Sequence, residues 1–248
     1  MLVCVGISSS ASGFLIPQLE DPTVGFGITT DGSWIASILE IGSLSGAIFG
    51  GLLSEKLGRR RSLMTDSVLF LFGTLLTAFS IDLNMIMVGR FIQGHSATSA
   101  LVVAPLYTCE ICQPKVRRYT ALLIDLCWNV GIAISYLLGI QTGYTLTKYV
   151  DNFVKSMFLG ALLPWRHAIG LTTIFPIASL ALLLICPESP TWFISKGEEV
   201  EARIALVKLR GENNMDVIEE EFGRILANHK LSQKRKTFGR PRRDYLLD

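Results

Sequence analysis

The residues with the most chemistry to offer lie on one apolar segment near the middle of this 248-residue chain. Asp125, Trp128 and Asn129 are three and four residues apart, so a helix would present them on one face, followed by Ile132 and Tyr136. A carboxylate, an amide, an indole and a phenol suit hydrogen bonding and ring stacking with a hydroxylated solute in a hydrated cavity. A buried contact between two helices explains the same stripe equally well.

The sequence pattern offers little for covalent chemistry or metal binding. His95, His167 and His229 are scattered, and no Ser/His/Asp grouping or phosphate-binding glycine loop is evident. Cys109 and Cys112 form a CxxC, but a zinc site needs a second such pair. The sequence therefore predicts a protein that is not an enzyme and that has no cofactor.

The segments that must position these residues are long and apolar. Half of the residues are hydrophobic and 18% are charged, against about 25% charged in soluble domains, and the mean hydropathy is +0.43. Apolar runs of roughly 20 residues span a bilayer. The pattern predicts an all-α membrane protein, a six-transmembrane-helix bundle, with spans at residues 2–16, 34–53, 62–80, 85–107, 119–140 and 167–186.

The orientation of the spans follows from their loops. The turn at residues 54–61 and the loop at residues 112–118 are short and rich in Lys and Arg, as is typical of cytoplasmic loops. Residues 18–32 and 81–84 contain no Lys or Arg. We therefore expect an integral protein of the plasma membrane with both termini in the cytoplasm.

The charge distribution divides the chain into two predicted domains. Residues 195–248 hold 12 of the 23 basic residues and 10 of the 21 acidic ones. We expect a six-span bundle at residues 1–190, and cytoplasmic amphipathic helices with a basic tail at residues 191–248. The basic segment at residues 230–243 fits a solvated cytoplasmic flank of the membrane spans better than a contact with anionic lipid. In a protein with six membrane spans we do not expect a nucleic-acid partner.

Several charges lie at membrane depth, where they usually face a partner or a hydrated cavity. We expect Asp66 to pair with one of the basic residues at 59–61, and Glu110 to lie close to Arg117. Arg90, near the end of its span, would reach the interface. Glu40 would face another polar helix.

The span at residues 34–53 has glycines at every fourth position. Gly42, Gly46 and Gly50 form one ridge on a helix, and such a ridge allows another helix to approach closely.

Five separate motifs share order and spacing with one family, the sugar porters of the major facilitator superfamily. These motifs occupy residues 51–60, 89–94, 105–117, 165–166 and 187–192. Residues 17–19 and 33–35 further resemble the insect facilitated trehalose transporter-like group. The resemblance implies the N-terminal half of a major facilitator fold, with this chain as a half-length fragment.

The same resemblance implies a function. The intact protein would move trehalose or a hexose across the bilayer by facilitated diffusion, with two bundles exposing a midplane site alternately to each side. The missing C-terminal half, or a partner transporter chain, would complete the site. The residues implied to face the solute are Gln93, Asp125, Trp128 and Asn129, and those implied to form inner-gate contacts are Glu55, Arg59, Arg60, Glu110, Arg117 and Glu188.

Two alternatives remain open from the sequence. Asp125 and Glu40 could carry protons with the solute, which would make the protein a proton-coupled sugar symporter. Residues 8–12 hold only serine and alanine where the family usually has an acidic residue, and this favours facilitated diffusion. The chain could instead be a non-transporting truncated regulator that pairs with a full-length transporter.

Overall fold

The structure is a computed structural model that describes residues 1–20, 32–113, 116–141, 165–211 and 215–238. Within these ranges every regular element is an α-helix, which confirms the predicted all-α class. The chain divides into two compact units, Met1–Cys186 and Pro187–Asp248. The predicted loop at residues 141–166 lies almost entirely outside the described residues.

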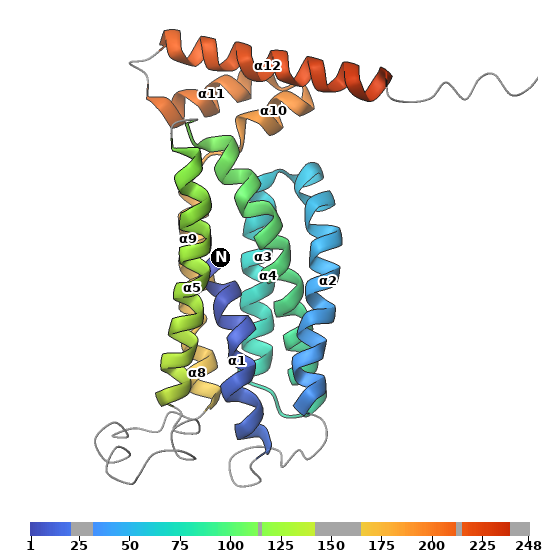
Figure 1. The fold of residues 1–248 in the computed structure, drawn as a ribbon, viewed down its shortest axis with the longest axis vertical. Coiled ribbons are helices and arrows are strands. Elements are labelled where there is room, and N and C mark those ends of the chain that lie inside the picture. The colour runs from blue at the N-terminus through green and yellow to red at the C-terminus, as the bar shows by residue number, and fades with distance from the viewer. Residues whose placement is uncertain (21–31, 114–115, 142–164, 212–214, 239–248) are drawn as a thin grey trace, which may run out of the picture. The chain divides into compact units, whose positions relative to one another are not determined.

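The first unit consists of long helices that run side by side (Figure 1). The most extensive packing joins α2 to α4, α3 to α4 and α1 to α5. Its helices are α1 (Leu2–Glu20), α2 (Gly32–Leu57), α3 (Arg59–Ala78), α4 (Leu83–Ile111), α5 (Arg117–Gln141), α8 (Trp165–Leu171) and α9 (Ile174–Ile185).

The glycine ridge of α2 packs directly on α4, as its spacing predicts. A Cβ atom at Gly46 would overlap the carbonyl oxygen of His95, and one at Gly42 would overlap that of Phe91. Gly94 of α4 reciprocates, because a Cβ there would overlap the carbonyl oxygen of Leu39. The two backbones therefore approach as closely as the absence of side chains allows, which is a common way for helices to associate in membranes.

Polar and apolar residues are distributed in the reverse of the soluble pattern. Asp66, Arg90 and Gln93 are buried, as are the hydroxyls of Ser62 and Ser99, all on α3 and α4. The outward faces of α2, α5 and α9 carry large exposed hydrophobic side chains. The hydrocarbon core of a bilayer contains no water that could hydrogen-bond to polar groups. This arrangement therefore fits a bundle whose apolar exterior contacts lipid.

Three described stretches are long and apolar enough to cross a membrane, namely Gly32–Leu57, Tyr119–Leu138 and Arg166–Ile185. Leu2–Gly13 is a shorter apolar helix. The helices α3 and α4 are not among these stretches, and both carry buried polar groups. That the bundle has six transmembrane spans therefore remains a prediction.

Pro17 in α1 and Pro176 in α9 have different effects on their helices. We expected Pro17 to end the first span, but α1 continues through it to Glu20. The sixth predicted span is interrupted at Thr172 and Thr173, between α8 and α9. Pro176 has no N–H to donate to the carbonyl of Thr172, and its ring crowds that carbonyl. The hydroxyl of Thr172 instead donates to the carbonyl of Ile169 at 2.6 Å.

The second unit is a small helical assembly with its own apolar cluster. It contains α10 (Pro190–Lys196), α11 (Glu199–Arg210) and α12 (Met215–Phe238). Both predicted amphipathic segments are helical, since they lie in α11 and α12. The cluster that joins the three helices comprises Ile194, Ala202, Leu206, Ile218 and Phe222.

Ion pairs reinforce the contact between α11 and α12. Arg210 binds Glu221 through two nitrogens, each 2.9 Å from a carboxylate oxygen. Arg203 lies 2.6 Å from Glu219, and its guanidinium stands 4.4 Å from the ring centroid of Phe222. Paired charges and an apolar seam thus hold the two helices together.

Candidate functional site

A buried arginine lies at the centre of the polar interior of the first unit. Arg90 of α4 is 1% exposed. Its Nη1 donates to the carbonyl of Ser8 at 3.2 Å and to Oε1 of Gln93 at 3.3 Å, and its Nη2 donates to the hydroxyl of Ser12. The sequence predicted that Arg90 would reach the membrane interface. Instead the guanidinium turns inward and ties α4 to α1.

Gln93 belongs to the same cluster. Its Nε2 donates to the hydroxyl of Thr74 on α3 at 3.3 Å, so its side chain connects Arg90 with α3. Both side chains line a small cavity of about 20 Å³ between α1, α3, α4 and α8. The structure therefore places Gln93 inside the helical bundle.

The three predicted solute-facing residues of α5 have different surroundings. Asp125 and Asn129 are exposed, and the amide of Asn129 donates to the carbonyl of Asp125 at 2.8 Å. Trp128 is half-buried against α1, where a Cβ atom on Gly6 would lie 3.0 Å from its ring. None of the three lines the cavity beside Gln93. The structure thus separates Gln93 from the α5 residues.

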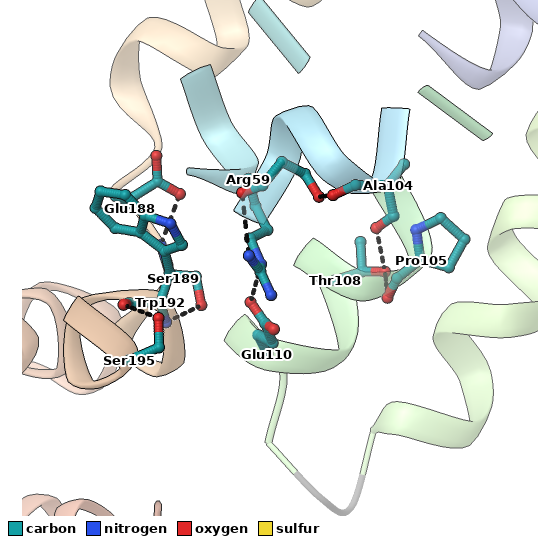
Figure 2. A network of polar contacts seen from close by, with 11 residues as sticks. Arg59, Ala104, Pro105, Thr108, Glu110, Glu188, Ser189, Trp192 and Ser195 are labelled. Carbon is teal, nitrogen blue, oxygen red and sulfur yellow. Dashed lines mark hydrogen bonds and ion pairs between the residues drawn. The ribbon is translucent and has the colours of Figure 1, made fainter. Parts of the chain in front are cut away.

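The first predicted gate contact joins the start of α3 to the end of α4. Nε of Arg59 lies 3.2 Å from Oε2 of Glu110 (Figure 2). The two groups form an ion pair without hydrogen-bond alignment at Nε, and Nη1 of Arg59 donates to the carbonyl of Ser54 at 3.0 Å. The sequence placed Glu110 beside Arg117. In the structure Nη2 of Arg117 donates to the carbonyl of Cys109 at 2.9 Å.

Arg60 makes a different contact from its neighbour. Its Nε donates to the carbonyl of Leu183 at 2.7 Å, and its Nη2 donates to that of Leu184 at 2.9 Å. Both carbonyls belong to the last turn of α9, where backbone oxygens lack helical partners and a positive charge is favourable. Arg60 therefore fastens α3 to the end of α9.

The other two predicted gate residues, Glu55 and Glu188, belong to α2 and to the second unit. Glu55 is exposed near the end of α2. Glu188 belongs to the second unit, where its Oε1 accepts a bond from the backbone N–H of Ser189 at 3.0 Å. The hydroxyl of Ser189 in turn accepts from the N–H of Trp192 and caps α10 (Figure 2). Glu188 and Ser189 together order the first turn of that helix.

Asp66 does not have the partner that the sequence predicted. It is 1% exposed on α3, and its Oδ2 accepts a hydrogen bond from the hydroxyl of Ser99 at 2.9 Å. Within the described residues it forms no ion pair with the basic residues that open α3. One helical turn more than expected separates it from that end of the helix, because α3 already begins at Arg59.

The sequence did not predict three serine partners in this interior. Ser8 and Ser12 of α1 bind Arg90, and Ser99 of α4 binds Asp66. Isolated serines are common in membrane helices, so nothing in their spacing pointed to these roles. The serine-rich run at residues 8–12 of α1 was the only available signal.

A larger cavity of about 240 Å³ is lined by residues of α1, α3, α4, α5 and α9. Tyr107, Thr108, Cys127 and Ser179 supply its polar and sulfur groups, and Leu63 and Leu183 are among its apolar walls. It holds no ionisable carboxylate or arginine among its lining residues. Its chemistry therefore does not resemble that of the Arg90 cluster.

A helical bundle with an apolar exterior and buried polar groups is typical of a membrane protein. The chain belongs to the sugar (and other) transporter family, whose model matches residues 9–243. This finding confirms the resemblance to sugar porters. It also confirms that the chain is a transporter homologue and not an enzyme.

The curated relatives are insect proteins. The chain is 34% identical over 212 residues to the "Facilitated trehalose transporter Tret1-2 homolog" of Drosophila sechellia. The match covers 85% of this chain and 39% of the relative. It is 34% identical over 237 residues to the "Facilitated trehalose transporter Tret1" of Apis mellifera ligustica, which covers 95% of this chain and 43% of the relative. The chain thus spans about two fifths of the length of these relatives.

Solved structures share the fold. The proton:xylose symporter XylE bound to 6-bromo-6-deoxy-D-glucose matches with a TM-score of 0.75 at 21% identity, over 96% of this chain and 52% of that one. A partially occluded inward-open form of the xylose transporter XylE from E. coli matches with a TM-score of 0.74 at 19% identity, over 95% and 57%. These matches identify the arrangement of helices as that of a major facilitator protein.

Proposed function

We propose that this chain is the N-terminal half of a protein that carries a sugar, trehalose or a hexose, across the plasma membrane by facilitated diffusion with alternating access. The observation that carries the proposal is the 34% identity to facilitated trehalose transporters over 95% of the chain. The two exposed polar residues of α5, Asp125 and Asn129, support it, because they are available to a second half-bundle or a solute.

The surroundings of Arg90 favour one mode of transport over the other. Its described partners on α1 are the neutral groups of Ser8 and Ser12. A carboxylate there would offer a proton-binding site next to the buried cation, and α1 supplies none in this position. Facilitated diffusion is therefore favoured over symport with protons.

The proposed topology has two domains. Residues 1–190 form six spans, and residues 191–248 form cytoplasmic helices and a basic tail, with both termini in the cytoplasm. The basic turn between α2 and α3 and the basic loop after α4 support this orientation. The gate of the proposed transporter includes the pair Arg59–Glu110 on the cytoplasmic side.

Uptake by proteoliposomes tests the proposal. The complete protein, at the full length of its relatives, is reconstituted and supplied with radiolabelled trehalose or glucose, with and without a pH gradient. We expect saturable uptake that ignores the gradient. Uptake that follows the gradient would replace facilitated diffusion by proton symport, and the absence of saturable uptake of any sugar would refute the transport function.

The regulatory alternative has a distinct signature. A truncated regulator would co-purify with a full-length transporter and would change that transporter's uptake without any uptake of its own. Matched proteoliposomes with the 248-residue chain, the complete protein and both together separate these outcomes.

A further inference from the structure

The charge on Arg90 has no carboxylate in direct contact with it among the described residues. Its two terminal nitrogens bind a carbonyl, an amide oxygen and a hydroxyl, all of which are neutral. Glu40 on α2 acts on Arg90 electrostatically, but no carboxylate oxygen lies within 4.0 Å of it in the described part of the chain. Isolated charges are costly to bury, so a buried guanidinium normally has an anionic partner.

A small cavity adjoins this charge. Its volume is about 20 Å³, above the roughly 10–15 Å³ that a single water requires, so it has room for one small occupant. The polar side chains that line it are those of Ser8, Thr74, Thr77, Arg90, Gln93 and Thr172.

Two of these side chains have unused hydrogen-bond donors. Nε of Arg90 and the hydroxyl of Ser8 are both buried and have no hydrogen-bond partner within the described structure. Unsatisfied buried donors of this kind are rare and call for an occupant that accepts hydrogen bonds. Both belong to residues that line the same cavity.

The threonines can add further donors. The hydroxyls of Thr74 and Thr77 donate to backbone carbonyls of their own helix, and that of Thr172 donates to a carbonyl of the preceding helix α8. Such carbonyls are already accepting helical N–H groups, and hydroxyl hydrogens rotate to suit their surroundings. Each hydroxyl can therefore turn toward an anion without leaving its helix unsatisfied.

We infer that the cavity beside Arg90 binds a small monovalent anion, chloride, which joins α1, α3, α4 and α8 through the guanidinium and the surrounding hydroxyls. A water molecule would accept the same two hydrogen bonds, but it would leave the guanidinium without an anion in direct contact. A chloride ion would accept these hydrogen bonds and would also place a negative charge in contact with the guanidinium. This inference concerns the folded bundle and does not depend on the proposed sugar transport.

The test measures the unfolding temperature of the purified 248-residue chain in detergent, in sodium chloride and in sodium gluconate at equal ionic strength. Chloride that binds only the folded state raises the midpoint. We expect a rise of about 2–4 °C when chloride is roughly five-fold above its Kd. Bromide should substitute for chloride, and its anomalous scattering in crystals should place it beside Nε of Arg90.

Variants identify the site. Arg90→Gln should abolish the difference between chloride and gluconate, whereas Arg224→Gln, at an exposed position on α12, should retain it. Should Arg90→Gln fail to fold, Ser8→Ala keeps the charge, removes one donor and should reduce the apparent chloride affinity several-fold. Equal midpoints in both salts for the unaltered chain would overturn the inference and leave water as the occupant. A chloride effect that persists undiminished in both cavity variants would overturn it as well.

Discussion

Nε of Arg59 and Oε2 of Glu110 lie 3.2 Å apart and link the first residue of α3 to the end of α4. Their side chains are only 15% and 16% exposed, so solvent screens the pair less than an ion pair on the surface. The second unit contains a natural comparison, because Arg203 and Glu219 are 2.6 Å apart yet 48% and 53% exposed. Burial, not distance, distinguishes the two pairs.

Glu110→Gln should therefore lower the free energy of unfolding by about 1–3 kcal/mol, since it leaves Arg59 partly buried without its charged partner. The matched control Glu219→Gln should cost about 0–1 kcal/mol, as exposed pairs usually do. Chemical denaturation of the detergent-solubilised protein measures both. Equal losses in the two variants would show that burial does not set the strength of these pairs.

Arg60 should matter for the end of α9. Arg60→Met removes both hydrogen bonds to the carbonyls of Leu183 and Leu184, and we expect a loss of about 1–3 kcal/mol in stability. Hydrogen exchange in the last turn of α9 should become faster. Arg224→Met, at an exposed position on α12, serves as the control. Unchanged exchange in Arg60→Met would mean that α9 ends stably without this arginine.

The sequence predicted the class of the fold well because bilayer-length apolar runs and basic turns are strong, local signals. The approach of α2 to α4 was also predictable, since Gly42, Gly46 and Gly50 repeat at a helical period that only a close neighbour explains. These features depend on spacing along one segment. No knowledge of the partner helix was needed.

Partners of single polar residues were not predictable in the same way. Asp66 binds Ser99, which is 33 positions away, and Arg90 binds Ser8, which is 82 positions away. Periodicity reports which face of a helix is polar, but not which neighbour that face meets. The break at Thr172 was missed for a related reason, because Pro176 follows it by four residues inside an otherwise continuous apolar run.

The close packing of α2 on α4 leads to a sharp prediction. Gly46→Ala should destabilise the protein by several kcal/mol, about 2–4, because the added methyl group would overlap the carbonyl oxygen of His95 and force the helices apart. Gly51→Ala lies on the same helix with open space around it. It should stabilise the protein by about 0.5–1 kcal/mol, since alanine favours a helix over glycine.

Thermal unfolding of both variants, purified identically, compares the two positions. The opposite signs are the diagnostic feature, because both substitutions add the same methyl group to α2. A neutral Gly46→Ala variant would show that α2 and α4 pack less closely than the structure has them.

The proposed solute contacts on α5 predict a transport phenotype. Asp125→Asn and Asn129→Ala should each raise the KM for sugar uptake by roughly 10-fold in the complete protein, since one lost hydrogen bond to a solute is worth about 1 kcal/mol or more. Leu123→Ala changes an exposed residue on the other side of the same helix and should leave the KM unchanged. Equal effects at Leu123 and Asp125 would remove the case for a polar solute-binding face.

Trp128 separates the two interpretations of the polar stripe on α5. It packs against Gly6 of α1, and its buried indole Nε1 has no hydrogen-bond partner among the described residues. If the ring serves as a helix contact, Trp128→Phe keeps the packing, removes the unsatisfied N–H and changes stability by less than about 1 kcal/mol, with normal sugar uptake. If the indole N–H binds the solute, the same variant should raise the KM for uptake while unfolding remains normal. We expect the first result, because the ring faces α1, whereas Asp125 and Asn129 are exposed. Uptake and unfolding measured on the same preparation distinguish the two outcomes.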